Sequence, residues 1–265
     1  MNRFQKNLIE MKSFLDKSGI LNFRFSQILY WYIYRFYKRQ YEGRSLHRVI
    51  RYLAHNPTSH EKFKVILDVG AHIGSSTDLM IEYFPQSRII AFEPDPRNTE
   101  WFGNFLSQQI TKGSVELIKK AIWSSSGEIP FTFQASNTAD NKFDAGSDVK
   151  VPSISIDDYA LRTGIKIDLM KIDVQGFEWE VIKGSLVTLQ QQRPSLILEL
   201  DLEALNARGG SENELFDLLG ELNYSVINPI DGKTLNRSRV KDLIAAERCI
   251  DLLLVPISDK VTEKS

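Results

Sequence analysis

The amino-acid sequence predicts an α/β fold in which helices cover both faces of a mostly parallel sheet. Apolar runs recur between residues 63 and about 202, and stretches long enough for crossover helices separate them. The runs are continuous rather than alternating, which is typical of strands buried on both faces. With 265 residues, of which 42% are hydrophobic, the chain is long enough to bury one substantial core. We therefore expect one doubly wound main domain.

Residues 1–60 contain no strand-like run and are predicted to form a helical N-terminal extension. Within it, residues 23–41 combine nine aromatic side chains with four Lys or Arg residues. Phe25, Leu29, Tyr32 and Phe36 fall near one helical stripe, which favours a helix docked on the domain or across a homodimer interface. A peripheral membrane helix, a substrate lid and a nucleic-acid contact are the alternatives.

The main domain is expected over residues 61–258, followed by a flexible tail at 259–265. Its predicted strands are Phe63–Val69, Arg88–Phe92, Val115–Trp123, Ile167–Val174 and Ser195–Leu200. Its predicted helices are Ser75–Phe84, Pro96–Ile110, Phe177–Gln191 and Ser211–Leu222, the last opened by a Ser-x-x-Glu capping pattern. Two further strands, Tyr224–Asn228 and Ile250–Val255, flank a turn at residues 229–232 and suit an antiparallel edge of the sheet.

The stretch VILDVGAHIG at residues 65–74 is typical of a nucleoside site. An apolar strand runs into a turn with glycines, where the backbone can approach a ligand closely, and a helix follows. A dinucleotide site favours G-x-G-x-x-G, but Ala71 replaces the middle glycine and Asp68 precedes the turn. Because S-adenosylmethionine carries cationic groups and no pyrophosphate, an acidic loop suits it better. The alternative is that these residues only shape a tight turn.

The second strand ends at Glu93-Pro94, 25 residues after Asp68. This spacing is close to the offset of about 20 residues expected of an acid that binds a ribose in a Rossmann-like unit. A carboxylate there can accept hydrogen bonds from both ribose hydroxyls. We therefore expect Glu93 to bind the cofactor ribose, whereas an isolated glutamate at a strand end is usually just solvated.

Four segments resemble the FkbM family of S-adenosylmethionine-dependent methyltransferases: residues 67–74, 91–95, 155–159 and 168–184. The resemblance implies a Rossmann-like, class I sheet of seven strands with an antiparallel C-terminal edge hairpin. It also implies O-methylation of a hydroxyl, often on a sugar, a glycolipid or a natural product. Family members usually carry Glu where this chain has Gln175. The expected cofactor-binding residues are Asp68, Gly70, Ala71, His72, Gly74, Glu93, Pro94 and Ala121.

Methyl transfer from a sulfonium requires an aligned acceptor and a group that removes its proton. Asp173, at the carboxyl end of the fourth strand, is the predicted base or acceptor-orienting residue, and a helix N-cap is the alternative role. Strand alternation places Lys171 on the same face as Asp173. Asp157, Glu178 and Glu199 are the predicted substrate-binding residues.

Glu199 lies inside an apolar run, so its carboxylate needs a partner. One hypothesis pairs it with Asp173 around a Mg²⁺ ion, which prefers oxygen ligands. We favour a hydrogen-bonded or substrate-contacting Glu199 and predict no metal site.

Charge and cysteine content limit the alternatives. The 33 Lys and Arg residues nearly cancel the 34 Asp and Glu residues, so no global field favours nucleic acid or a bilayer. The single cysteine, Cys249, excludes an internal disulfide and agrees with a cytoplasmic protein. No secretory signal or membrane-spanning stretch is predicted, although the aromatic arm leaves peripheral membrane contact open.

Two other classes of function remain open at this stage. One is a catalytically idle nucleoside-binding protein of the same fold, because fold does not guarantee chemistry. The other is a nucleotide-dependent oxidoreductase, which Ala71 disfavours because it replaces the middle glycine of a dinucleotide loop. The expected small-molecule or glycan acceptor has no signature in the sequence.

Overall fold

The computed structural model describes residue 33 and residues 44–56, 63–133, 142–143, 146–247 and 249–257. Eight strands form the main sheet in the order β11-β10-β12-β9-β8-β1-β2-β3. They are β1 Val65–Val69, β2 Arg88–Phe92, β3 Val115–Ile118, β8 Leu169–Ile172, β9 Ser195–Leu200, β10 Tyr224–Ile227, β11 Thr234–Leu235 and β12 Ile250–Pro256. Five neighbouring strands, from β3 to β9, run parallel, so the predicted α/β sheet is confirmed.

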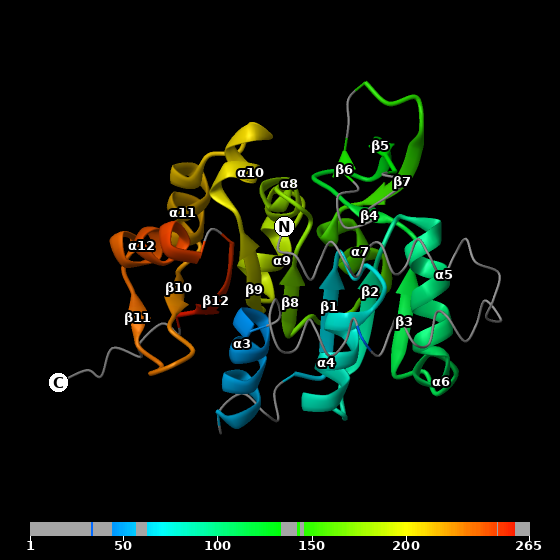
Figure 1. Cartoon of the computed structure of the whole chain (residues 1–265), viewed down its shortest axis with the longest axis horizontal. Coiled ribbons are helices and arrows are strands. Elements are labelled where there is room, and N and C mark those ends of the chain that lie inside the picture. Colours follow the sequence, from blue (N-terminus) through cyan, green and yellow to red (C-terminus); the bar gives the residue numbers. More distant parts are fainter. Residues whose placement is uncertain are drawn as a thin grey trace.

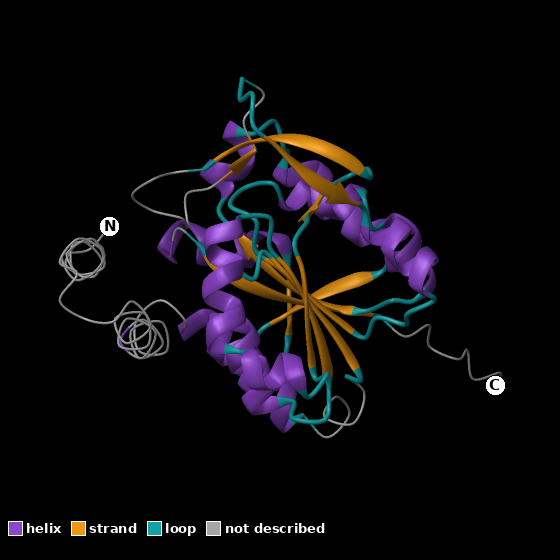
Figure 2. Cartoon of the chain, turned by 90° about the vertical axis from the view of Figure 1, so that its right-hand side faces the viewer, coloured by secondary structure: helices purple, strands orange, loops and turns teal. Residues whose placement is uncertain are grey.

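Helices cover both faces of this sheet, as the edge-on view in Figure 2 shows. One face packs against α3 (Arg44–His55), α4 (Ser75–Tyr83) and α5 (Pro96–Phe105). The other face packs against α7 (Ile156–Thr163), α8 (Glu178–Lys183), α9 (Leu186–Gln191), α10 (Leu202–Ala207), α11 (Glu212–Glu221) and α12 (Arg237–Glu247). Each of the five parallel strands contributes apolar side chains to both layers, which explains why these sequences are apolar without regular alternation.

Helix α3 belongs to the part of the chain for which an N-terminal extension was predicted. Its residues Val49, Ile50 and Leu53 are buried against the sheet beside α4. Ser45 also accepts a hydrogen bond from the backbone N–H of Asp251 in β12, at 2.9 Å. The helix is thus part of the main core. The predicted aromatic arm, residues 23–41, lies outside the described residues except for Ile33, and so does the predicted tail.

The C-terminal strands are antiparallel, as predicted, but their arrangement is more complex. β12 lies between β9 and β10 and is antiparallel to both. The turn after β10 leads into the two-residue strand β11, which forms the edge hairpin, and then into α12. Neither β11 nor α12 was predicted. The main sheet therefore has one short strand more than the seven expected.

A second, four-stranded sheet with the order β4-β7-β5-β6 was also not predicted. Its strands are β4 Ala121–Ile122, β5 Gly127–Thr132, β6 Lys142–Phe143 and β7 Lys150–Ile154. The predicted strand Val115–Trp123 ends early because the chain turns at Lys119 and Lys120, and its last residues join this second sheet. In Figure 1 the small sheet lies above the carboxyl ends of β1 and β2.

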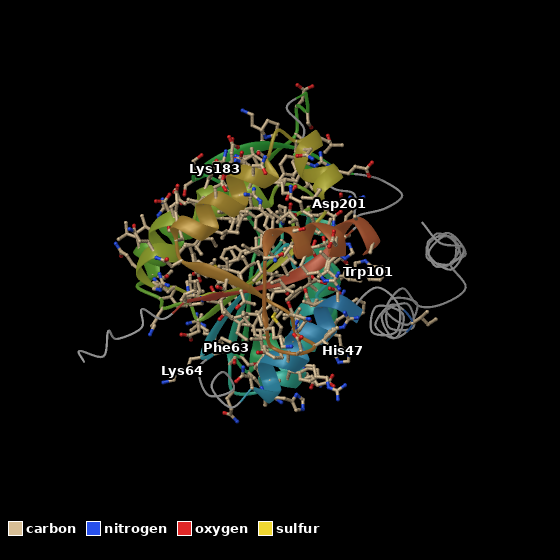
Figure 3. All side chains as sticks on the ribbon, turned by 90° about the vertical axis from the view of Figure 1, so that its left-hand side faces the viewer. His47, Phe63, Lys64, Trp101, Lys183 and Asp201 are labelled. Atoms are coloured by element: carbon tan, nitrogen blue, oxygen red, sulfur yellow. The ribbon has the colours of Figure 1, made fainter. Side chains whose placement is uncertain are left out.

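Two predicted helices are each divided into two. Pro96–Ile110 forms α5 and α6 (Ser107–Thr111), and Phe177–Gln191 forms α8 and α9. Between α8 and α9, a Cβ on Gly184 would lie 2.2 Å from the Trp123 carbonyl oxygen, so the chain approaches β4 closely at this break. The carboxyl ends of the parallel strands meet at one side of the molecule. In Figure 3 that side is marked by Asp201, after β9, and the opposite side by Phe63, before β1.

Candidate active site

The loop after β1 is held against the end of β2 by its backbone. The N–H groups of Gly70 and Ala71 both donate to the carbonyl of Phe92, each at 3.0 Å. Gly70 has a φ of 79° and Gly74 a φ of 95°, in the region that favours glycine. A Cβ on Gly70 would lie 1.9 Å from the Asp173 carbonyl oxygen. The loop is therefore in direct contact with the chain that follows β8.

Glu93 follows β2 and faces this loop. Its Oε2 accepts from the backbone N–H of His72 at 2.9 Å, and its Oε1 accepts from Asp95 N–H at 3.0 Å and from Asn98 Nδ2 at 3.1 Å. The residue is only 6% exposed. Burial raises the pKa of Glu93 to about 7, and the hydrogen bonds from Asn98, Asp95 and His72 only partly oppose that rise. Oε2 has one protein donor, so it retains a lone pair for a ligand hydroxyl.

Asp68 occupies a different position from the one expected. The residue is fully buried, and its Oδ2 accepts from Ser76 Oγ at 2.8 Å and from Thr77 Oγ1 at 2.6 Å. Its Oδ1 lies 3.5 Å from Lys171 Nζ. Helix α4 folds back over the face of β1 that carries Asp68, so the carboxylate joins the end of β1 to the helix. The predicted direct cofactor contact has no support in this geometry.

Asp173 lies where the sequence predicted, one residue beyond the end of β8. Its side chain is 25% exposed, and its Oδ2 lies 2.9 Å from Lys171 Nζ. Gln175 Nε2 donates to Oδ1 at 3.3 Å. The alternative role as a helix cap is wrong, because α8 starts at Glu178 and its N-cap position is Phe177. Asp173 therefore presents a partly accessible carboxylate beside the loop after β1.

Glu178 is 1% exposed, which does not suit the predicted contact with a substrate. Its Oε1 accepts from the N–H groups of Val174 and Gly176, at 3.1 and 3.0 Å. These bonds hold the turn in which Gln175 has a φ of 58°. Burial raises the pKa of Glu178 to about 7, although the backbone hydrogen bonds lower it.

Asp157 also has a local partner. Its Oδ2 accepts from Val187 N–H at 3.0 Å and its Oδ1 from Thr188 N–H at 2.8 Å, so it satisfies free donors at the start of α9. The predicted acceptor contact of Asp157 therefore has no support in this geometry.

Glu199 is half-buried on β9, where it is opposite Asp251 of β12. Its negative charge contributes to the raised pKa of Lys171. Within the described ranges, no group of three or more His, Cys, Asp or Glu side chains is arranged to hold a metal ion. Positive charge beside Asp173 comes from Lys171 instead.

The family model described as the methyltransferase FkbM domain matches residues 68–226. The chain belongs to the FkbM methyltransferase family. Methyltransferase sdnD of Sordaria araneosa is 29% identical over 154 residues, which cover 45% of this chain and 59% of that protein. The 2-O-methyltransferase NoeI of Sinorhizobium fredii (strain NBRC 101917 / NGR234) is 28% identical over 149 residues, which cover 49% and 60%.

Among solved structures, an FkbM methyltransferase from Methylobacillus flagellatus KT is similar with a TM-score of 0.48 and 17% identity, covering 73% of this chain and 44% of that one. The chain thus spans about 60% of the length of the curated relatives it matches. The described part of this FkbM methyltransferase contains no helix that is long and apolar enough to cross a membrane.

Several residues of this FkbM methyltransferase site were missed or undervalued at the sequence level. Asn98 binds Glu93, Ser76 and Thr77 bind Asp68, and Arg208 donates to the Gln175 carbonyl at 2.8 Å. Hydroxyl residues just after the glycine loop were a usable signal for the buried Asp68. Arg208 carried none, because α10 approaches the site only in the folded chain. Pro94 is half-buried beside Glu93, and Ala121 is buried on β4.

Proposed function

We propose that this FkbM-family methyltransferase uses S-adenosylmethionine to methylate a hydroxyl group of a sugar, a glycolipid or a natural product. The observation that carries the proposal is the meeting of three groups at the carboxyl ends of β1, β2 and β8: the glycine loop, Glu93 and Asp173. The name of the relative NoeI, a 2-O-methyltransferase, supports the O-methyl part.

The residues present fit that cofactor. The loop at Gly70–Gly74 brings its backbone close to the ends of β2 and β8, and Glu93 retains an acceptor for the ribose hydroxyls. Asp173 adds a carboxylate whose charge suits a cationic group. When bound, S-adenosylmethionine supplies a methyl group on a sulfonium.

Within the proposed mechanism, Asp173 orients the acceptor. Its carboxylate would accept a hydrogen bond from the acceptor hydroxyl and take up its proton while the S–CH₃ bond of the cofactor breaks, the C–O bond forms and S-adenosylhomocysteine is left. Lys171 and Gln175 each donate to one oxygen, so the carboxylate is held in one orientation. Holding the acceptor oxygen in line with the methyl group provides the remaining rate enhancement.

The first test is calorimetry with S-adenosylmethionine and S-adenosylhomocysteine. We expect both to bind, and Glu93→Ala to weaken both. If neither binds but NADH does, the protein is an oxidoreductase instead.

The second test is transfer of a labelled methyl group to cell extracts, with mass spectrometry of the product. We expect Asp173→Asn to keep binding of the uncharged-sulfur product S-adenosylhomocysteine and to lose about 10²–10⁴-fold in transfer rate. Dialysis against EDTA should leave transfer unchanged if Lys171 supplies the cation beside Asp173. Cofactor binding without transfer to any extract would favour the idle nucleoside-binding alternative.

A further inference from the structure

Lys171 on β8 carries a buried ammonium group between the loop after β1 and Asp173. The side chain is 2% exposed. Its Nζ lies 2.9 Å from Asp173 Oδ2, 3.3 Å from the Gly70 carbonyl oxygen and 3.5 Å from Asp68 Oδ1. The ammonium donates hydrogen bonds to the first two oxygens and is in ion-pair distance of the third, which makes no hydrogen bond within the described part of the chain. Because an unpaired buried charge is very costly, these contacts fix the position of the side chain.

The register of the sheet explains why these groups meet. Asp68 and Lys171 are direct partners in the parallel β1–β8 pair. Asp173 lies two residues beyond Lys171 on the same face of the sheet. Asp68 in turn binds Ser76 and Thr77 in the first turn of α4. A continuous polar chain therefore links the helix after the loop to the carboxylate of Asp173.

The charges of the three linked side chains, Asp68, Lys171 and Asp173, do not cancel. Among these three side chains, the two carboxylates of Asp68 and Asp173 outnumber the one ammonium by one negative charge. Burial alone lowers the pKa of Lys171, but the charges of Asp173 and Asp68 outweigh burial and raise it, so the side chain stays protonated. The neighbouring elements add Glu199 from β9, Glu178 from α8, Cys249 just before β12, and Arg208 through the Gln175 carbonyl.

We propose that Lys171 is a positioning residue that ties the loop after β1 to Asp173 and sets the preference of the site between cationic S-adenosylmethionine and neutral S-adenosylhomocysteine. The inference rests on the proposed function, because it assumes that these two molecules occupy the loop beside Asp173. Without Lys171, the charges of Asp173 beside the loop and of the buried Asp68 would act on the sulfonium without the opposing charge of the ammonium.

The excess of negative charge around Lys171 also affects the rate of methyl transfer. The positive charge on sulfur disappears as the methyl group leaves, so excess negative charge stabilises the bound substrate more than the transition state. Lys171 limits that excess while it keeps Asp173 in place for the acceptor. A lysine with only a packing role would have no effect on the discrimination between the two ligands.

The experiment compares the affinities of S-adenosylmethionine and S-adenosylhomocysteine by calorimetry, with the full chain and each variant. We expect Lys171→Met to raise the affinity for S-adenosylmethionine, relative to that for S-adenosylhomocysteine, roughly tenfold. The reason is that the substitution removes one positive charge near the sulfonium, and the Coulomb energy of one such charge corresponds to a change of this size. Lys171→Arg retains the charge and should keep the ratio near that of the unsubstituted protein. Circular dichroism checks that each variant is folded.

Asp68→Asn should change the same affinity ratio in the opposite direction. This variant remains usable if Lys171→Met does not fold. Asparagine still accepts the hydroxyl hydrogen bonds of Ser76 and Thr77, but it removes one negative charge, so the ratio should fall. Lys233→Met is the matched control, because this lysine is 80% exposed and its loss should leave the ratio unchanged.

Equal loss of both affinities in Lys171→Met, or an unchanged ratio in Asp68→Asn, would overturn the inference and leave the proposed function standing. If the unsubstituted protein binds neither molecule, the proposed function itself fails.

Discussion

At the scale of single residues, the sequence identified the right segments better than the directions of their side chains. Glu93 and Asp173 both lie beside the loop after β1, as their places at strand ends predicted. Asp68, two residues before Gly70, is instead buried under α4. Strand alternation shows which side chains share a face, but not which helix will cover that face. The role of Asp68 therefore depended on packing that the sequence does not show.

Glu93 is expected to make cofactor binding depend on pH. Its pKa is about 7 in the free protein, and the ionised carboxylate is the better acceptor for ribose hydroxyls. Below that pH the carboxyl group must release a proton on binding, so the affinity should rise as the pH increases from 5.5 to 7.5. Titration with S-adenosylhomocysteine over this range measures the effect.

Glu93→Gln serves as the control for this titration. Its amide has no ionisable proton, so the dependence on pH should disappear, and the affinity at pH 7.5 should fall by about 10–100-fold. A variant with the same pH profile as the unsubstituted protein would show that another group titrates.

Gly70 is expected to tolerate no side chain. In Gly70→Ala the Cβ would lie 1.9 Å from the carbonyl oxygen of Asp173, so the loop and the chain after β8 must separate. Gly113→Ala is the matched control, because Gly113 has a similar φ of 75° and nothing within 4 Å of its Cβ position. The control should cost about 1–2 kcal/mol of stability and leave S-adenosylhomocysteine binding intact, whereas Gly70→Ala should lose binding. Equal affinities in the two variants would contradict the close approach.

At the scale of elements, the parallel strands were predicted most accurately. Arg88–Phe92 and Ser195–Leu200 have the predicted bounds, because continuous apolar runs between polar turns are distinctive. The second sheet was missed, since β4 and β6 have two residues each and β7 alternates buried and exposed positions only briefly. Such strands are stabilised by partners distant in sequence, which local patterns do not show.

Asp157 is expected to stabilise α9 rather than bind a substrate. Asp157→Ala removes the acceptor for two backbone N–H groups and should lower the free energy of unfolding by about 1–2 kcal/mol. Urea unfolding measures the change. Ser211→Ala, which removes the N-cap of α11, should cost a similar amount. Neither variant should change the cofactor affinity, or the Michaelis constant for an acceptor once an acceptor is found. A change in that Michaelis constant in Asp157→Ala but not in Ser211→Ala would restore the predicted substrate role of Asp157.

At the scale of the whole molecule, the parallel sheet and its two layers of helices followed from the alternation of strand and helix in the sequence. The place of β12 between β9 and β10 did not, because sequence patterns do not specify which strands pair. The site also concentrates ionisable groups that the fold has buried, and two of them are Glu93, which binds the loop after β1, and Glu178, which binds the turn after β8. Their protonation therefore affects the stability of the entire domain.

We expect the carboxyl groups of Glu93 and Glu178 to make the folded protein more stable at pH 5 than at pH 7.5. Both have a pKa of about 7 when folded and an ordinary value of 4.5. Between these values the folded state binds more protons than the unfolded state, so the free energy of unfolding falls as the pH rises and levels off above pH 7. Each group contributes about 3 kcal/mol over the whole range.

Glu178→Gln tests this dependence, because glutamine retains an acceptor for Val174 and Gly176 but cannot ionise. Urea unfolding at pH 5 and pH 7.5 should give a smaller difference between the two pH values for the variant than for the unsubstituted protein. The change in the free energy of unfolding that Glu178→Gln causes, measured against the unsubstituted protein, should therefore be more favourable at pH 7.5 than at pH 5. An equal loss of stability at both pH values would mean that Glu178 is ionised to the same extent in the folded and unfolded states over this range, and that its hydrogen bonds alone determine its contribution.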